Sequence, residues 1–293
     1  MPQTRTPERP RGSRGTLSGR LGLLPLGVAL LALPAPTRSP SPPRRVVALA
    51  PSAAEILFAL GAAPRVVGVS DLAADLPEAA GKARVGGFAP DLERVVSLAP
   101  DLVVVSRDGT DRAAFEKLEA LGLAVVVTGG ATLAGVLEDV RRVGHALGED
   151  ERARALVAAL AKRIAAAEAR GRARSRARAL VLIWPDPPVA AGPGTFVGDV
   201  VKRAGFVNVV PESAGDWPRV SFETLAAWNP DLVIRPETRE NADAFTRAFS
   251  DARWRLVPAV SGGRVVALPG DLLERPGPRL VEALERLAAV NVP

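Results

Sequence analysis

Two glutamates, Glu93 and Glu223, occupy the same position in two copies of one sequence block. Residues 91–106 read DLERVVSLAPDLVVVS and residues 221–236 read SFETLAAWNPDLVIRP, so the copies align without a gap. In each copy the glutamate stands seven residues before a Pro-Asp-Leu-Val sequence. Two equivalent carboxylates can form charge-assisted hydrogen bonds with two cationic partners, or each can simply favour the N-terminus of its own helix. Both interpretations stay open on the residues alone.

A second set of chemically useful side chains falls in loops that follow predicted strands. Its members are Ser52, Asp71, Phe88, Arg107, Trp184, Trp217, Asp271 and Arg275. Small, aromatic and a few polar groups of this kind suit a large, flat, partly polar organic ligand held between lobes. Trp184 and Trp217 are equally compatible with a hydrophobic core, but the polar neighbours Asp216 and Arg219 favour exposure of Trp217.

The composition gives little support to catalysis or to metal binding. The chain has no cysteine, no tyrosine and one histidine, His145. A thiol nucleophile, a phenol acid and a histidine pair are therefore excluded, and we expect no catalytic residue and no metal site. A haem iron would need an axial His, Tyr, Cys or Met, and only Met1 and His145 are available. We expect His145 to have a surface or packing role. The loop at residues 192–198 lacks the glycine spacing of a phosphate cradle.

The block that carries the glutamates is expected to fold identically in both copies. Asp91 or Ser221 caps a short helix, and Pro100 or Pro230 ends it. The apolar β-branched run that follows is typical of a buried parallel strand. A duplicated unit of this kind predicts two similar lobes.

Strand and helix patterns alternate along the rest of the chain, which predicts an α/β fold with parallel sheets and ligands at the carboxyl ends of the strands. We expect a first lobe at residues 44–147, a connecting helix at 148–176 and a second lobe at 177–293. Ser52 and Glu55 fit the S-x-x-E capping box of the first helix. The predicted strands span residues 45–49, 65–69, 102–105, 124–127, 179–184, 207–210, 232–236 and 264–268. The other predicted helices span residues 113–121, 133–147, 196–204, 242–249 and 279–290.

Residues 1–38 form a basic leader. Six arginines against one glutamate give it +5 of the chain's net +6, so the remainder gives no reason to expect nucleic-acid binding. The 13-residue apolar run at residues 21–33 is too short to span a bilayer and suits a signal peptide, although an uncleaved anchor or a misassigned start remains an alternative. Without cysteine there is no lipidation site. We expect an exported, soluble, monomeric periplasmic protein.

A family resemblance follows from these segments. Residues 46–70, VVALAPSAAEILFALGAAPRVVGVS, and the block DLERVVSLAPDLVVV resemble the first lobe of the vitamin B12-binding periplasmic proteins. These belong to the iron-siderophore, haem and cobalamin group of ABC-transporter substrate-binding proteins. DWPRVSFE and GDLLERPGPR resemble the second lobe, so the likeness runs from Arg45 to about Pro293. It implies two Rossmann-like lobes joined by one long helix, with the ligand in the cleft between them.

The resemblance also implies roles for individual residues. Glu93 and Glu223 match the exposed glutamates that dock onto arginines of the two permease subunits. Trp217, Asp271 and Arg275 match cobalamin contacts.

The chain departs from the family pattern where aromatic residues are expected. Leu72 stands in place of a tyrosine, Phe88 lies where a tryptophan is missing, and leucines at 272 and 273 replace aromatics. The identity of the corrinoid is therefore left open.

The resulting hypothesis is a substrate-binding protein that captures cobalamin or a related corrinoid as transported ligand, without a cofactor and without catalysis. A ferric siderophore or haem receptor of the same group is the first alternative. Anionic chelates are bound by arginine and tyrosine clusters, and only Arg107 and Arg275 are placed for that role. A periplasmic enzyme that handles tetrapyrroles or metals, and a receptor used for signalling, are alternatives of other classes.

Overall fold

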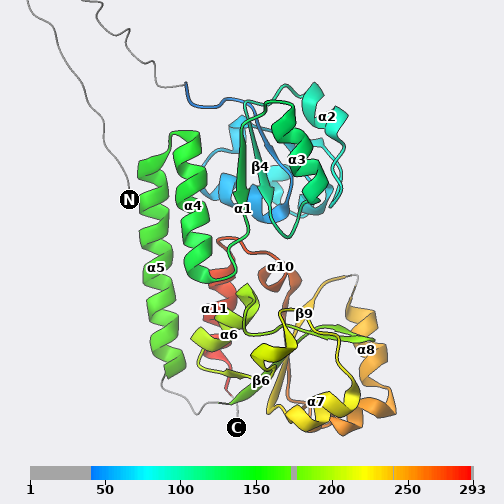
Figure 1. The fold of residues 1–293 in the computed structure, drawn as a ribbon. Coiled ribbons are helices and arrows are strands. Elements are labelled where there is room, and N and C mark those ends of the chain that lie inside the picture. Colours follow the sequence, from blue (N-terminus) through cyan, green and yellow to red (C-terminus); the bar gives the residue numbers. More distant parts are fainter. Residues whose placement is uncertain (1–40, 173–176, 240, 292–293) are drawn as a thin grey trace, which may run out of the picture. The chain divides into compact units, whose positions relative to one another are not determined.

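The computed structural model describes residues 41–172, 177–239 and 241–291, which fold into two α/β lobes and a long helix (Figure 1). The predicted leader, with its apolar run at residues 21–33, lies outside the described residues. Within the described ranges, no helix combines the length and apolar character that crossing a membrane requires.

The sheet of the first lobe is parallel throughout, in the order β3-β2-β1-β4-β5. Its strands are β1 (Val46–Ala48), β2 (Val66–Val69), β3 (Ala83–Arg84), β4 (Leu102–Ser106) and β5 (Val125–Thr128). All residues of β1 and β4 are buried, as the β-branched runs predict for central strands. The chain leaves β1 towards β2 on one side and β4 towards β5 on the other. The carboxyl ends of β1 and β4 therefore flank a topological switch point, where parallel α/β sheets bind ligands.

The helices of the first lobe agree with the apolar periodicity. They are α1 (Pro51–Ala59), α2 (Leu92–Ser97), α3 (Arg112–Ala120) and α4 (Leu133–Leu147), with 3₁₀ turns at 63–65, 71–73 and 77–79. The predicted capping box of α1 is wrong. Helix α1 begins at Pro51, its N-cap is Ala50, and no side chain caps it. A proline at the first helical position needs no N–H partner, so Ser52 and Glu55 are left for other roles inside the protein.

Helix α5 (Asp150–Arg172) has 23 residues and is about 34 Å long at 1.5 Å per residue. It runs beside α4 after a left-handed turn at Gly148 (Figure 1). A Cβ at Gly144 would lie 2.4 Å from the Cβ of Ala153, so only glycine allows the two helices to approach this closely. Arg163 fixes α5 to helix α11 (Leu280–Ala289) through a bidentate pair with Glu285, at 2.9 and 2.7 Å. The long helix is thus braced by both neighbours.

The sheet of the second lobe has the order β10-β9-β6-β7, and β8 pairs with the start of β6. Its strands are β6 (Arg178–Pro185), β7 (Pro188–Ala190), β8 (Val207–Asn208), β9 (Leu232–Glu237) and β10 (Val265–Pro269). All neighbours are parallel except β7, which turns back antiparallel on β6. No strand was predicted at residues 188–190, so β7 is an addition to the parallel sheet that was expected.

The remaining helices of the second lobe surround its sheet. They are α6 (Phe196–Arg203), α7 (Phe222–Trp228), α8 (Ala242–Phe249), α9 (Pro258–Ser261) and α10 (Gly270–Leu273), with 3₁₀ turns at 212–214 and 252–256. Trp254 is the largest fully buried side chain here, and it packs edge-on against Phe222 and Phe249. This aromatic cluster joins α7 and α8 to the sheet.

The two copies of the duplicated block adopt the predicted helix and strand in the same order. Asp91 accepts a hydrogen bond from the Arg94 amide at 2.9 Å, and Ser221 accepts one from the Thr224 amide at 3.1 Å, so both predicted caps are confirmed. The residue before each proline has a positive φ, 43° at Ala99 and 40° at Asn229 in the second copy.

A polar brace that the sequence pattern did not reveal fixes each copy to the central strand of its sheet. Asp101 accepts the Arg45 amide at 2.9 Å, and Asp231 accepts the Arg178 amide at 2.8 Å. The guanidinium groups of Arg45 and Arg178 in turn donate to carbonyls at the end of α2 and α7. Each brace thereby satisfies helix-end carbonyls that have no partner within the helix.

Candidate ligand-binding site

A cavity of about 480 Å³ opens where the strand ends of the two lobes meet. The first lobe lines it with Ala50, Pro51, Ser52, Leu72, Ser106, Asp108 and Gly109. The second lobe contributes Ile183, Phe196, Trp217, Leu273, Glu274, Arg275 and Pro276. Residues 50–52 follow β1 and residues 106–109 end and follow β4, so the cavity covers the switch point of the first sheet. The cavity therefore lies at the strand carboxyl ends, where the sequence predicts that a ligand binds, and binding there stays a prediction.

A second cavity of about 780 Å³ adjoins the first and shares Leu72, Glu274 and Arg275 with it. Its remaining lining comes from the loop at residues 71–75 and from residues 237–239 and 269–271, at the ends of β9 and β10. Together the two cavities form one broad depression, called the cleft below. It is wide enough for part of a large organic ligand to remain exposed.

The aromatic part of the cleft is held in place by the edge of the second sheet. Trp217 is 46% exposed, and its ring packs edge-to-face against that of Phe196, with 5.9 Å between the ring centroids. The Gly192 amide donates to Asp216 O at 2.7 Å and the Ala190 amide donates to Pro218 O at 3.0 Å. The loop that carries Trp217 is therefore fixed on both sides of the tryptophan. A fixed aromatic face suits stacking or edge contact with a flat ligand.

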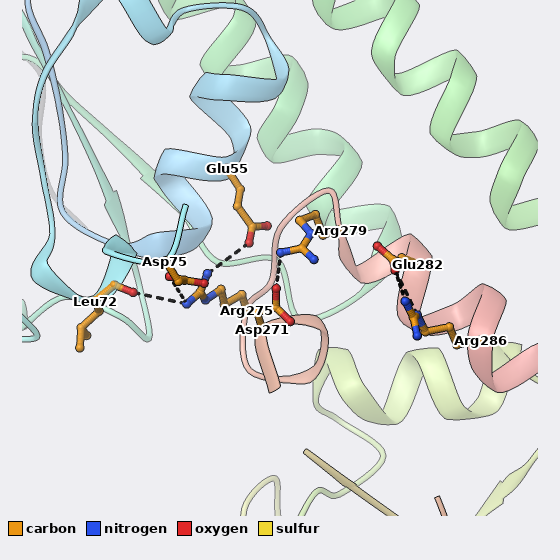
Figure 2. Close-up of polar contacts among 8 residues, drawn as sticks. All are labelled: Glu55, Leu72, Asp75, Asp271, Arg275, Arg279, Glu282 and Arg286. Atoms are coloured by element: carbon orange, nitrogen blue, oxygen red, sulfur yellow. Dashed lines mark hydrogen bonds and ion pairs between the residues drawn. The ribbon is translucent and has the colours of Figure 1, made fainter. Parts of the chain in front are cut away.

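Arg275 contacts both lobes and lines both cavities (Figure 2). Its Nη2 donates to Asp75 Oδ1 at 2.9 Å and to Leu72 O at 3.4 Å. Its Nη1 lies 3.6 Å from Glu55 Oε1. Only 15% of the side chain is exposed, so the guanidinium group is largely shielded from solvent.

Glu55 lies in the contact between the lobes rather than at a helix end (Figure 2). Burial raises the pKa of Glu55 to about 7, although Arg275 and Arg279 act to lower it. Asp271 raises it further but is itself paired with Arg279. Burial therefore outweighs the nearby positive charges at this carboxyl group.

A profile of periplasmic binding proteins matches residues 46–272, which is most of the chain. The chain belongs to this family. The resemblance and the α/β fold class predicted from the sequence are confirmed.

Relatives of this periplasmic binding protein carry different ligand names. A cobalamin-binding protein of Halobacterium salinarum is 32% identical over 256 residues, covering 85% of this chain and 69% of the relative. A vitamin B12-binding protein of Vibrio cholerae is 26% identical over 260 residues, covering 88% and 92%. Among solved structures, a periplasmic haem-binding protein of Roseiflexus sp. RS-1 is 27% identical with a TM-score of 0.76, covering 84% and 96%.

The structure brings some of the predicted ligand residues together and separates others. Ser52, Leu72, Trp217 and Arg275 line the cavity of about 480 Å³, and the adjoining cavity adds Asp71 and Asp271. The ligand role of all of these remains a prediction.

Three predicted ligand residues lie elsewhere. Arg107 lines a separate cavity of about 270 Å³ beside Phe115 and β5. Phe88, 56% exposed, and Trp184, 42% exposed, are absent from the lining of both cleft cavities over the described chain. The Trp184 indole donates instead to Asp186 O at 3.0 Å.

Several lining residues were not predicted, namely Phe196, Ile183, Ser106, Asp108 and Pro276. Ser106 and Asp108 could have been predicted from the strand-end rule, which places ligands at the carboxyl ends of parallel strands. Ser106 ends β4 and Asp108 follows it, just as Ser52 follows β1. Ile183 precedes Trp184 on β6, and alternation along a strand directs neighbouring side chains to opposite faces. Ile183 therefore lines the cleft, whereas Trp184 lies on the opposite face of β6.

Glu93 and Glu223 are both exposed, and each is the second residue of its helix. The pKa of Glu223 is lowered, first by a hydrogen bond with the Ser221 side chain and then by its own backbone N–H. A carboxylate at a helix N-terminus also interacts favourably with the helix dipole. The exposed positions of Glu93 and Glu223 at helix N-termini are thus compatible both with stabilisation of their own helices and with contact to an external partner.

His145 lies exposed on α4, with Nδ1 3.1 Å from Asp150 Oδ1, so its predicted surface position is confirmed. Throughout the described ranges, no group of three or more histidine and carboxylate residues is arranged to hold a metal ion.

Proposed function

We propose that this chain is the substrate-binding protein of an ABC importer and that it captures cobalamin or a related corrinoid in its cleft. The cobalamin-binding and vitamin B12-binding relatives support this ligand class, because their similarity extends over at least 85% of the chain. The function is binding and delivery rather than catalysis. The corrinoid is the transported ligand and not a resident cofactor.

The proposal of a corrinoid ligand rests mainly on the charges of the residues that line the cavity at the switch point. Arg275 is the one cation among its lining residues, and it is directed at Asp75, Leu72 O and Glu55. Asp108 and Glu274 add negative charge to the same lining. A corrin ring carries mainly neutral amide side chains, which can donate hydrogen bonds to such carboxylates. Carboxylate-bearing haems and anionic ferric chelates would instead meet like charges.

The apolar and aromatic lining supports the same ligand. Trp217, Phe196, Ile183 and Leu273 offer an apolar face beside the polar groups. A flat macrocycle with polar substituents at its edge matches this combination. Leu72, 53% exposed at the junction of the two cavities, takes the place of the aromatic group expected there.

Haem is the second candidate, because the haem-binding protein of Roseiflexus sp. RS-1 is similar in fold and 27% identical. The side chains that line the two cleft cavities include no His, Tyr, Cys or Met to bind the iron axially. Haem would then bind only through its ring and its propionates. The cavity at the switch point offers the propionates only Arg275, which already donates to Asp75 and Leu72 O, and the adjoining cavity adds one further cation, Arg239. Haem is therefore expected to bind more weakly than a corrinoid.

The glutamates of the duplicated block are proposed to dock onto the permease. Both are exposed and both occur at the second position of equivalent helices. A receptor with two equivalent carboxylates can match arginines on two related permease subunits and fix its orientation through charge-assisted hydrogen bonds. Export to the periplasm by the leader, and action as a monomer, complete the proposal.

Isothermal titration of the purified chain tests the ligand class. Cyanocobalamin and cobinamide are titrated in parallel with haemin and a ferric siderophore at one pH and one ionic strength. We expect saturable binding of a corrinoid that is at least tenfold tighter than binding of either anionic chelate. Tighter binding of haemin would establish the second candidate, and absence of binding for all four compounds would reject the ligand class.

A further inference from the structure

The contact between the lobes contains one arginine that reaches from the second lobe into the first. Arg275 follows helix α10, and its guanidinium group meets Leu72 O, Asp75 and Glu55, all on the first lobe (Figure 2). The same side chain lines both cavities of the cleft. A change in how Arg275 is held would therefore alter both the lobe contact and the ligand surface.

Glu55 is an unusual partner for this arginine because its charge is poorly satisfied. Only 4% of its side chain is exposed. Both carboxyl oxygens, and Nη1 of Arg275, have no hydrogen-bond partner among the described residues. A Cβ at Gly277 would lie 2.3 Å from Glu55 Oε2, so the carboxyl group packs against bare backbone. Burying an ionised group with so few hydrogen bonds is costly.

The position of Glu55 connects it to the cleft. Ser52 lies on the same helix and lines the cavity at the switch point, and so does Pro276 beside the glycine that covers the carboxyl group. Residues 273–276 of segment 273–277 thus line the ligand cavity, while Arg275 and Gly277 of the same segment contact Glu55.

We propose that Glu55 is a positioning residue of the cleft, whose carboxyl group, covered by Gly277 beside Arg275, sets how firmly segment 273–277 is held against the first lobe. The lobe contact is independent of which ligand binds, whereas its consequence for affinity rests on the proposed function. Glu55 touches no ligand in this scheme.

The direction of the effect follows from the groups that act on Glu55. Burial raises its pKa to about 7, Arg275 and Arg279 lower it, and Asp271 raises it. If segment 273–277 moves away, water reaches the carboxyl group and its pKa returns towards the ordinary 4.5. A group whose pKa is raised in the contacted state favours that state at low pH. The contact is therefore tightest in acid and loosens as the pH rises to about 7.

Asp75 titrates in the opposite direction and can be separated from Glu55. Burial acts to raise the pKa of Asp75, but hydrogen bonding and attraction from Arg275 outweigh it, and the net pKa is lower than the ordinary 3.8. Asp75 therefore stays ionised above pH 5. Measurements between pH 5.5 and 8.5 report on Glu55 rather than on Asp75.

Hydrogen exchange of the purified, ligand-free chain tests the proposal. After correction for the intrinsic pH dependence of exchange, we expect protection of residues 71–76 and 273–277 to fall on the order of tenfold between pH 5.5 and about 7, and to level off above pH 7. Glu55→Gln should keep high protection at every pH, since the neutral amide mimics the protonated acid. The control Glu78→Gln, at an exposed site, should behave as the parent chain.

Two further measurements keep the test decisive. If Glu55→Gln fails to fold, Arg275→Gln should show lower overall protection of the same segments, and the fall with pH should persist at higher pH because the arginine no longer lowers the pKa of Glu55. Cyanocobalamin affinity of the parent chain should change over the same pH range, and that change should vanish in Glu55→Gln. Flat protection in the parent chain, or a retained fall of protection with pH in Glu55→Gln, would overturn the role of Glu55. A pH-dependent contact without cobalamin binding would uphold it and reject only the proposed ligand.

Discussion

The two copies of the duplicated block, α2–β4 and α7–β9, are most alike on their outer side. Each has a capped helix start, an exposed glutamate at the second helical position and an aspartate brace to the central strand. They differ at the inner ends of their strands. Ser106 ends β4 in the cavity at the switch point, whereas Glu237 ends β9 in the adjoining cavity.

This contrast indicates that the two sides of the block serve different purposes. An outer surface repeated in both lobes suits a partner built from two related subunits. An inner surface that differs between lobes suits a single ligand without internal symmetry. The duplication therefore supplies a common frame, and the loops beyond it determine what is bound.

The largest expected effect comes from reversing the charge of the repeated glutamates. The double substitution Glu93→Arg with Glu223→Arg should lower ligand uptake through the permease at least about a hundredfold, because two charge pairs become repulsive. Ligand affinity should not change. Uptake of labelled cyanocobalamin into cells, compared with titration of the purified variant, measures both quantities.

Glu151→Arg is the matched control for this prediction. Glu151 is also exposed and also stands at the second position of a helix, α5. If its reversal lowers uptake equally, the glutamates act through their helices and not through docking. Each single variant of the pair should lie between the control and the double variant.

The asymmetry of the inner side can be tested with two tryptophans of similar exposure. Trp217→Ala should weaken cyanocobalamin binding about thirtyfold, or about 2 kcal/mol, because it removes the aromatic face of the cavity. Trp184→Ala should weaken binding less than threefold, since Trp184 is outside the lining residues of both cavities. Equal effects in isothermal titration would contradict the boundary drawn for the site.

The aspartate braces should differ in strength. Asp101→Ala should lower the free energy of unfolding by about 1 kcal/mol, and Asp231→Ala by about half as much. Asp101 accepts two backbone amides, from Arg44 at 2.7 Å and from Arg45 at 2.9 Å, whereas Asp231 accepts that of Arg178. Urea denaturation of both variants measures the difference.

The contribution of Asp101 should also depend on pH. Hydrogen bonds from the Arg44 and Arg45 amides hold the pKa of Asp101 below its ordinary 3.8. A lowered pKa means that its stabilisation is present above pH 4 and disappears as the pH falls through the lowered value. An effect of Asp101→Ala that stays constant from pH 6 down to pH 2 would contradict this account.

The smallest effect concerns the residue before each proline. Ala99→Gly should raise the free energy of unfolding by about 0.5 kcal/mol, because a positive φ of 43° strains alanine and not glycine. Asn229→Gly should change it less, since asparagine tolerates this conformation better. Thermal denaturation of the two variants, side by side, compares the copies. A loss of stability in Ala99→Gly would count against backbone strain at this position.

The sequence predicted the parts of the fold that have long, regular patterns. The buried runs of β4 and β9 and the amphipathic helix at residues 133–147 appear as expected. Strand β3 has two residues, β7 has three, and helices α9 and α10 have four each, which is too short for any periodicity to be recognised.

Contacts between distant segments set the limit for predicting the site. The strand-end rule directed attention to Ser52 and Arg275, which line the cavity, but it could not distinguish Trp217, which also lines it, from Trp184, which does not. Glu55 was assigned to a capping box because its true neighbours, Arg275 and Gly277, are more than 200 residues away in the sequence. Its burial between the lobes depends on tertiary structure that no local pattern encodes.

A corrinoid that binds across the strand ends of both lobes should leave a hydrogen-exchange footprint on both of them. Exchange of the purified chain is compared with and without saturating cyanocobalamin. We expect new protection at residues 50–52, 106–109, 216–218 and 273–276, with no change around the cavity of about 580 Å³ that Lys202 and Pro211 line on the second lobe. Protection confined to residues 202–212, with none at the strand ends, would contradict this expectation.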